Sequence, residues 1–328
     1  MIMLKELMKC IREYKKPSIL APVLVSLEVV MECTIPFLIA MLVNQIKAGA
    51  EFSVLVKYGL LLIVMATLSL MFGIGAGNAC ATASCGFAKN VRKDLYAKIQ
   101  EFSFENIDKF SSSSLVTRLT TDVTNVQNAY MMIVRIAVRC PLMFLFAFVM
   151  AFIMGGKMAC IFLLVVPVLG FGLYMVIRTA MPLFRKVFHK YDELNNSIQE
   201  NIKGMRVVKS YVREEFEKEK FDRAAGDVCE DFTKAEKILA WNNPLMQFSL
   251  YTVMIFVLTV GSYVIITTKG LDLDVGQFSA LLTYSFQILS SLMMLSMVFV
   301  MVTLANESAH RQFSPSQGRD KVSCRPTT

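Results

Sequence analysis

Charged residues are scarce in this sequence. They make up 18% of the 328 residues, whereas hydrophobic residues make up 55%. A soluble globular protein of this length needs more polar surface around its core, and a disordered chain would not contain 24 Phe and 22 Met. The composition therefore excludes both classes and indicates a protein that lies in a membrane.

Signatures of metal and nucleotide sites are missing as well. None of the eight cysteines belongs to a CxxC pair, and the two histidines lie far apart in the sequence. The nucleotide-binding pattern G-x-x-x-x-G-K-[ST] occurs nowhere. Gly73, Gly75 and Gly77 lie inside an apolar stretch with no preceding strand, which favours close helix packing or local flexibility. We predict no metal-binding, cofactor-binding or catalytic residue here.

Six apolar stretches are long enough to cross a bilayer, whose ~30 Å hydrocarbon core needs about 20 helical residues. They cover residues 18–42, 54–79, 133–154, 158–177, 245–267 and 278–304. The third and fourth are separated only by Gly155, Gly156 and Lys157, which predict a hairpin turn. The expected fold class is therefore an all-α membrane protein with six transmembrane helices.

The basic residues are distributed unevenly around these stretches. Of the 34 Lys and Arg, 28 lie before the first stretch, within 80–130 or 178–243, or after residue 304. Because cytoplasmic segments keep the positive excess, these segments and both termini are expected in the cytoplasm. This topology accounts for the net charge of +8, so no nucleic-acid partner is expected. We expect an integral protein of a bacterial plasma membrane, in contact with lipid.

Residues 1–17 precede the first stretch and have an amphipathic pattern of their own. Apolar side chains occupy one helical face and basic side chains occupy the other. The apolar face contains Leu4, Leu7, Met8, Ile11 and Tyr14, and the basic face contains Lys5, Lys9, Arg12 and Lys16. The pattern is typical of an interfacial elbow helix that lies along the cytoplasmic leaflet and leads into the first span.

The two long connections between spans also show helical periodicity. Apolar residues repeat about every four positions in 87–99 and 115–130, and again in 187–205 and 221–232. A helical limb of about 25 residues reaches roughly 37 Å at 1.5 Å per residue. The spans are therefore expected to continue into the cytoplasm as long helical extensions, which we call legs.

The ends of these legs carry two specific patterns. The first leg end reads Phe104-Glu105-Asn106-Ile107-Asp108-Lys109-Phe110, followed by Leu115-Val116-Thr117-Arg118-Leu119-Thr120-Thr121-Asp122. The second reads Glu200-Asn201-Ile202-Lys203-Gly204-Met205-Arg206-Val207-Val208-Lys209. Together with the spans, they resemble the transmembrane domain of type I, exporter-fold ABC transporters. One departure is Ser113-Ser114, where much of that family has Gly-Glu.

The matching residues are Arg118, Leu119 and Asp122 in the family's leucine-x-x-arginine-leucine-x-x-aspartate pattern, and Glu200, Gly204, Arg206, Val208 and Lys209 in its second pattern. The resemblance implies two such domains that pack together with exchanged helices. It also implies that two coupling helices at the leg ends dock on ABC ATPase domains, which bind ATP and Mg and move the spans between inward-open and outward-open states. The residues implied in coupling are Glu105, Asn106, Asp108, Glu200, Gly204, Arg206 and Lys209, with Arg118 and Asp122 as the leg motif. The alternative interpretation of these residues is an ordinary helical hairpin exposed to water, with no role in coupling.

The function expected from this resemblance is that of a permease subunit of an ABC exporter, which moves hydrophobic or amphipathic drugs, lipids or peptides by alternating access. An importer with the same fold, or a truncated remnant that only dimerises, is the alternative.

The resemblance covers residues 1–311, with 18–311 as the transmembrane domain and 312–328 as a basic, disordered tail. Because no ATPase pattern is present, enzyme activity stays open. We expect a truncated or shifted reading frame near Arg311 rather than a separate ATPase polypeptide.

Four ionisable residues inside the predicted spans are candidates for specific roles. Glu28 and Glu32 share one face of the first span, where lipid exposure would cost several kcal/mol. We predict a cation-attracting site in the translocation cavity, and a structural pair or a protonated carboxyl between helices is the alternative.

Arg135 and Arg139 share a face of the third span, where we expect contact with lipid headgroups. An anionic substrate, or an interhelical ion pair with the two glutamates, is the alternative for these arginines.

Overall fold

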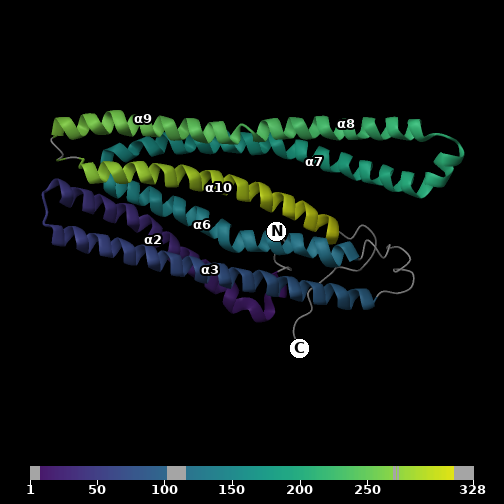
Figure 1. The fold of residues 1–328 in the computed structure, drawn as a ribbon, viewed down its shortest axis with the longest axis horizontal. Coiled ribbons are helices and arrows are strands. Elements are labelled where there is room, and N and C mark those ends of the chain that lie inside the picture. The colour runs from purple at the N-terminus through teal and green to yellow at the C-terminus, as the bar shows by residue number, and fades with distance from the viewer. Residues whose placement is uncertain (1–7, 102–115, 269–270, 272, 314–328) are drawn as a thin grey trace. The chain divides into compact units, whose positions relative to one another are not determined.

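The computed structural model describes residues 8–101, 116–268, 271 and 273–313 (Figure 1). Every regular element in these residues is helical. The longer elements are α2 (Lys15–Lys47), α3 (Phe52–Gln100), α6 (Val123–Gly155), α7 (Cys160–Ser210), α8 (Glu214–Leu239), α9 (Asn242–Thr268) and α10 (Val275–Phe313). The shorter ones are η1 (Met8–Tyr14), η2 (Arg118–Asp122) and η3 (Gly156–Ala159). The all-helical prediction is confirmed for this part of the chain.

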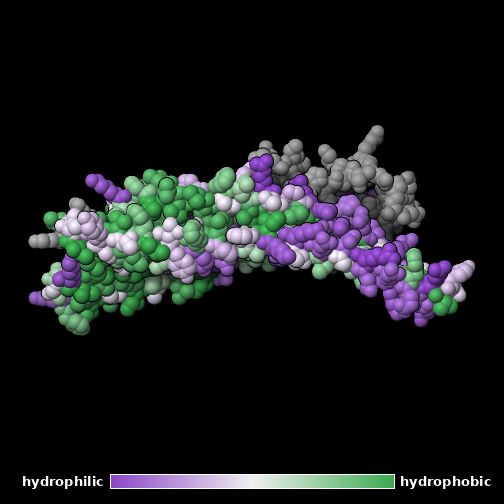
Figure 2. Space-filling model, turned by 90° about the horizontal axis from the view of Figure 1, so that it is seen from above, coloured by the Kyte–Doolittle hydropathy of each residue, from purple (hydrophilic) through white to green (hydrophobic). Residues whose placement is uncertain are grey.

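The predicted legs continue the apolar spans without a break in two helices. Helix α3 has 49 residues and α7 has 51, so each is roughly 75 Å long at 1.5 Å per residue. That length is more than twice the ~30 Å hydrocarbon core of a bilayer. The change from hydrophobic to hydrophilic side chains along the helices is visible in Figure 2.

Five helical stretches among the described residues are long and apolar enough to cross a membrane. They are Cys10–Lys47, Phe52–Gln100, Leu119–Ser210, Glu214–Thr268 and Val275–Val298. The third of these has 92 residues and contains both α6 and α7. Helix α6 ends at Gly155, and Gly156 has a positive φ of 48°, so the chain breaks where the hairpin turn was predicted. The count of six spans stays a prediction.

The chain divides into two compact units. The first consists of Met1–Leu163 and Val253–Thr328, and the second of Leu164–Thr252. In the first unit, α2 packs against α3, α6 and α10, and α6 also packs against α3 and α10. Small residues line part of this core, which contains Ala21, Ala79, Cys80 and Val134. Small side chains allow the helix backbones to approach closely, as is usual between helices in membranes.

In the second unit, a buried aspartate ties α7 to α8. Lys190 Nζ lies 2.9 Å and Lys186 Nζ lies 3.2 Å from Asp231 Oδ2, and the Asp231 side chain is only 5% exposed. The hydrogen bond from Lys190 lowers the pKa of Asp231 below its usual range. Because the pKa is lowered on folding, the stability contributed by this carboxylate is present above its ordinary pKa and is lost as the pH falls through the lowered value.

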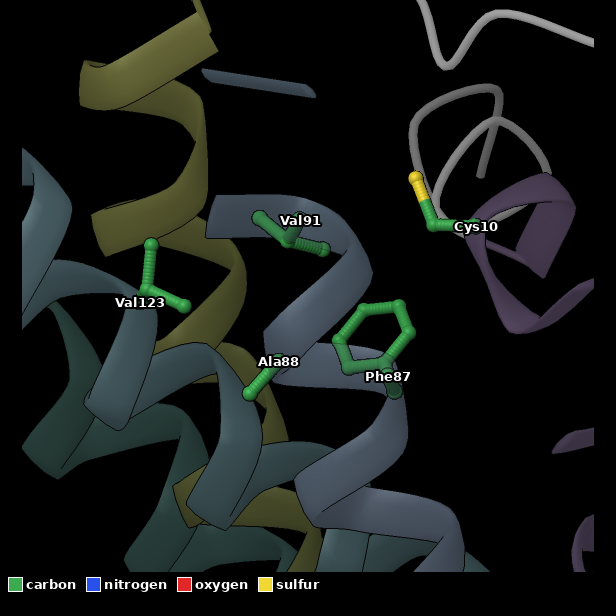
Figure 3. Close-up of a cluster of buried hydrophobic side chains, with 5 residues drawn as sticks. All are labelled: Cys10, Phe87, Ala88, Val91 and Val123. Atoms are coloured by element: carbon green, nitrogen blue, oxygen red, sulfur yellow. The ribbon is translucent and has the colours of Figure 1, made fainter. Parts of the chain in front are cut away.

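At the start of the first unit, η1 docks on α3 instead of forming a regular amphipathic helix. Arg12 has a non-helical backbone with φ 39°, and its guanidinium lies 2.8 Å from Asp94 Oδ2 on α3. Asn90 donates a hydrogen bond to the Cys10 carbonyl at 2.9 Å. Figure 3 shows Cys10 and Phe87 in the buried cluster that includes α3 and α6 residues. Residues 8–14 of the predicted elbow thus form a 3₁₀ helix, and residues 15–17 already belong to α2. The place of the elbow at the membrane surface stays a prediction.

The close approach of η1 to α3 generates a stability prediction. A Cβ at Gly86 would overlap the ring of Tyr14, whereas a Cβ at Gly59 on the same helix would meet nothing within 4 Å. We expect Gly86→Ala to destabilise the protein by about 1–3 kcal/mol because the ring must move. Gly59→Ala is the matched control, and it should be neutral or slightly stabilising because alanine favours helix. Thermal unfolding of the purified variants in detergent would measure both, and equal midpoints for the two variants would refute the predicted packing.

Candidate functional site

Three of the predicted intramembrane charged residues meet in one cluster. Glu28 and Glu32 are one turn apart on α2, and Arg139 reaches them from α6. Arg139 Nη1 donates to Glu28 Oε1 at 2.6 Å, and Arg139 Nη2 donates to both oxygens of Glu32 at 2.7 Å. We call Glu28, Glu32 and Arg139 the α2–α6 charge cluster. The interhelical ion pair that the sequence left open as an alternative is therefore present.

The two carboxylates of the cluster have different surroundings. The Glu28 side chain is 9% exposed, whereas Glu32 is 28% and Arg139 is 32% exposed. Both oxygens of Glu32 accept hydrogen bonds, but Glu28 Oε2 is buried without a hydrogen-bond partner among the described residues. A buried carboxylate oxygen that lacks a hydrogen-bond donor is unfavourable, so Glu28 is the less well hydrogen-bonded carboxyl of the cluster.

Helix α3 makes room for this cluster with glycine. A Cβ at Gly73 would lie 3.2 Å from Glu28 Oε1, and a Cβ at Gly75 would lie 3.2 Å from the Leu24 side chain. A Cβ at Gly77 would lie 3.9 Å from Arg135 Nη1. Of the two readings that the sequence left open, close helix packing and local flexibility, Gly73 and Gly75 show close packing, whereas Gly77 would leave room for a Cβ at ordinary contact distance. What the sequence did not reveal is that Gly73 lies against a charged side chain.

A proline lies inside each helix of the cluster, close to its charged residues. Pro36 lies within α2 and Pro141 within α6. A proline has no N–H to donate and crowds the carbonyl four residues earlier, which for Pro36 is that of Glu32. One residue further, the buried Tyr284 hydroxyl of α10 donates to the Cys33 carbonyl at 2.7 Å. The charge cluster therefore joins two helices that are each weakened at the same level.

Arg135, one turn before Arg139 on α6, has an exposed side chain. Its Nη1 lies beside Gly77 of α3, one turn away from the Gly73 that faces Glu28. The lipid-headgroup contact proposed for Arg135 and Arg139 stays a prediction. For Arg139, the guanidinium points to the two carboxylates of α2.

The leg motif coincides with an irregular turn of helix. Arg118–Asp122 forms the π-helical turn η2, which precedes α6. Such turns leave backbone groups without their usual helical partners and occur often at functional sites. From α3, Arg92 Nε donates to the Leu119 carbonyl at 3.3 Å, and Arg92 Nη2 donates to the Thr124 hydroxyl at 3.1 Å. The sequence analysis did not single out Arg92. In the sequence it is only one of several basic residues on the helix that faces the leg motif.

The other predicted coupling residues are placed only in part. Glu105, Asn106 and Asp108 lie outside the described residues, as does the side chain of Arg118. Asp122 is half-buried. Glu200, Gly204, Arg206 and Lys209 occupy the last turns of α7, which continues to Ser210, so this pattern is not a separate short helix. The prediction of two distinct coupling helices stays without confirmation.

Exposed apolar side chains surround the second pattern. Ile202 is 63%, Val207 is 59%, Tyr211 is 75% and Val212 is 80% exposed. Val212 also has a positive φ of 51°, which is unusual for a β-branched residue, where the chain reverses between α7 and α8. Such a set of exposed apolar residues on an otherwise charged leg is typical of a surface that contacts another protein.

These features define an all-helical membrane domain with long polar extensions, and comparison with known proteins gives its family. A family model described as the ABC transporter transmembrane region matches residues 18–293. The chain belongs to this family. The resemblance inferred from the leg patterns is therefore confirmed.

Several known proteins are similar in sequence to this region. The chain is 30% identical over 301 residues to an uncharacterized ABC transporter ATP-binding protein, YfiB, of Bacillus subtilis, covering 92% of this chain and 52% of that protein. It is 25% identical over 306 residues to an uncharacterized ABC transporter ATP-binding protein of Mycobacterium tuberculosis, covering 92% and 51%. An ATP-dependent lipid A-core flippase of Aromatoleum aromaticum is 25% identical over 228 residues, covering 68% and 36%. The chain thus spans about half the length of the first two relatives.

The geometry of the charge cluster predicts a large loss of stability when its cation is removed. Arg139→Ala leaves two carboxylates one turn apart in an apolar span, and we expect a loss of about 3–5 kcal/mol because a buried ion pair is broken on one side only. Arg135→Ala, at the exposed neighbour on the same helix face, should change stability by no more than about 0.5 kcal/mol. Unfolding of both variants in detergent would measure the difference. A loss for Arg139→Ala as small as that for Arg135→Ala would contradict this view of the cluster.

Proposed function

We propose that this chain is the permease part of an ATP-driven ABC exporter and moves hydrophobic or amphipathic substrates by alternating access. The observation that carries the proposal is the match to the ABC transporter transmembrane region together with apolar helices that continue into long polar legs. The named lipid A-core flippase among the relatives favours export of an amphipathic molecule. The proposed arrangement has six spans in a bacterial plasma membrane, with both termini in the cytoplasm.

The proposed partners are a second transmembrane subunit and ABC ATPase domains, which would bind ATP and Mg. The relatives are named ATP-binding proteins, and this supports the partnership with ATPase domains. The exposed apolar residues at the end of α7 would contact such a domain, with Glu200, Arg206 and Lys209 around them. A Cβ at Gly204 would meet nothing within 4 Å, so the glycine leaves open space for a partner to approach.

Force would reach the spans through helices that are continuous. Helix α7 runs from Cys160 to the second coupling pattern at Lys209, and α3 runs from Phe52 to Gln100. A displacement at a leg end can therefore reach a span through one continuous helix, although Pro167 and Pro182 lie within α7. Glu28 and Glu32 would lie along the translocation route and attract cationic substrates, with one formal negative charge left after pairing with Arg139.

A charge reversal at the leg end tests the coupling role. Arg206→Glu should weaken the binding of ATPase domains roughly tenfold and abolish substrate-stimulated ATP hydrolysis, because an exposed charge at the interface changes sign. Arg223→Glu on α8, also exposed, is the matched control and should leave both unchanged. The measurements are co-purification with an ATPase-bearing partner and ATP hydrolysis in proteoliposomes. A chain that pulls down no ATPase in either form would point to a non-transporting remnant.

Substrate selectivity tests the cation site. We expect Glu32→Gln to reduce transport of a cationic amphiphile about tenfold relative to a neutral one of similar shape, because the neutralised cluster no longer attracts a positive charge. Glu51→Gln, at the exposed start of α3, is the control and should keep the ratio. Transport into inside-out vesicles gives the ratio and also the direction of movement. An unchanged ratio for Glu32→Gln would remove the cation site from the proposal.

A further inference from the structure

The π-helical turn η2 differs from an α-helix in how its backbone is paired. In an α-helix the Leu119 carbonyl accepts from the N–H four residues later, which is that of Val123. Here the Val123 N–H donates to the Thr120 carbonyl. Because a π-helical turn is wider than an α-helical turn by one residue, η2 accommodates one extra residue directly before α6.

Arg92 of α3 forms hydrogen bonds to two points of this wider turn. Its Nε donates to the Leu119 carbonyl at 3.3 Å, and its Nη2 donates to the Thr124 hydroxyl at 3.1 Å. The Thr124 hydroxyl in turn donates to the Thr120 carbonyl at 2.9 Å. Both acceptors are uncharged and belong to residues five positions apart, which is the span of a π-helical hydrogen bond. The guanidinium therefore acts here as a planar pair of donors and not as the partner of a carboxylate.

The backbone of α3 is held on both sides of Arg92. Two residues further along α3, Asp94 Oδ2 lies 2.8 Å from the Arg12 guanidinium of η1. Five residues earlier, the Phe87 ring stacks on the Tyr130 ring of α6, with the ring centroids 4.6 Å apart. Arg92 therefore extends from a segment of α3 that is already fixed against η1 and α6.

The extra residue in η2 determines how the chain before it is rotated. If η2 relaxed to an α-helix while α6 stayed in place, each residue before the turn would move by one helical position. One position is a rotation of about 100° and a shift of about 1.5 Å. Val116 and Thr117 are the described residues before the turn, and both are exposed. The first coupling pattern, residues 104–110, precedes them in the sequence and lies outside the described residues.

We propose that Arg92 is a positioning residue that holds η2 as a π-helical turn and so sets the rotation of the chain that leads to the first coupling pattern. Without Arg92, the part-buried Leu119 carbonyl loses a donor, and the α-helical bond from Val123 is the replacement that restores one. The consequence for transport rests on the proposed function, because the face that the first coupling pattern presents to an ATPase domain would then depend on Arg92.

The rotation can be measured as a distance, without transport. Nitroxides attached through keto amino acids at Tyr96 and Val116 leave the native cysteines untouched, and both side chains are more than half exposed. Pulsed electron double resonance on the full chain in lipid nanodiscs gives their separation. We expect Arg92→Ala to change it by several ångströms, up to about the 10 Å diameter of a helix, because position 116 rotates around the helix axis. The distance from position 96 to Asn128 should stay the same, because Asn128 follows the turn on α6.

Two further variants test the reason for the change. Lys93→Ala is the matched control, because Lys93 is the next residue on α3, is exposed and carries the same charge. It should leave both distances unchanged. Arg92→Lys keeps the charge but lacks the planar pair of donors, so part of the molecules should show the changed distance.

Several results would overturn the proposal. They are an unchanged distance between positions 96 and 116 in Arg92→Ala, an equal change between positions 96 and 128, which would mean that α6 moves as a whole, or a change of either distance in Lys93→Ala. If Arg92→Ala does not fold, Arg92→Lys decides in its place, and a distance identical to that of the unmodified chain would refute the role of Arg92 as a pair of donors.

Transport by the same variants separates this inference from the proposed function. The measurement is uptake of a fluorescent cationic amphiphile into inside-out vesicles that also contain an ATPase-bearing partner. Arg92→Ala should lower the maximal rate at least about tenfold and leave the KM unchanged, because Arg92 positions the leg and not the substrate. A changed distance with normal transport, or no transport by the unmodified chain, would count against the proposed function alone. An unchanged distance overturns the role of Arg92 whatever the transport rate.

Discussion

Backbone hydrogen bonding in an apolar solvent is the constraint on which the rest of this structure depends. Lipid offers no partners for N–H and C=O groups, so a chain with this many apolar residues satisfies them within helices. All the described regular elements are helical, and α3 and α7 extend well beyond the thickness of a hydrocarbon core. The same solvent makes each charged side chain in a span depend on a partner, and Arg139 supplies that partner for two carboxylates.

Glycine and proline decide how closely and how firmly the helices of the first unit meet. Gly73 lets α3 approach the Glu28 carboxyl, and Gly86 lets η1 lay Tyr14 on α3. Pro36 and Pro141 remove helical hydrogen bonds beside the charge cluster. Ionic contacts therefore join α2 and α6 close to a proline in each helix.

The leg ends are under a different constraint. Outside the lipid, water can form hydrogen bonds with their polar groups. At η2 the backbone departs from α-helical geometry and Arg92 donates to the Leu119 carbonyl. At the end of α7 the chain leaves apolar side chains exposed around charged ones. Both features coincide with the two sequence patterns at the leg ends, which lie within the region matched by the ABC transporter transmembrane family, to which the chain belongs. The relatives are about twice as long as the matched region, so the activity of a complete transporter remains part of the proposal.

The sequence by itself determined the helices, the long legs, the turn at Gly155–Gly156 and the family. These depend on local composition and on a period of about 3.6 residues, both of which can be read along one chain. It also singled out Glu28, Glu32 and Arg139, since ionisable residues in an apolar stretch are conspicuous. Only the tertiary structure decided that these three meet, that Arg92 supports the leg motif and that η1 breaks at Arg12. Such contacts depend on how each helix is rotated and shifted against its neighbours, and no periodicity within a single helix contains that information.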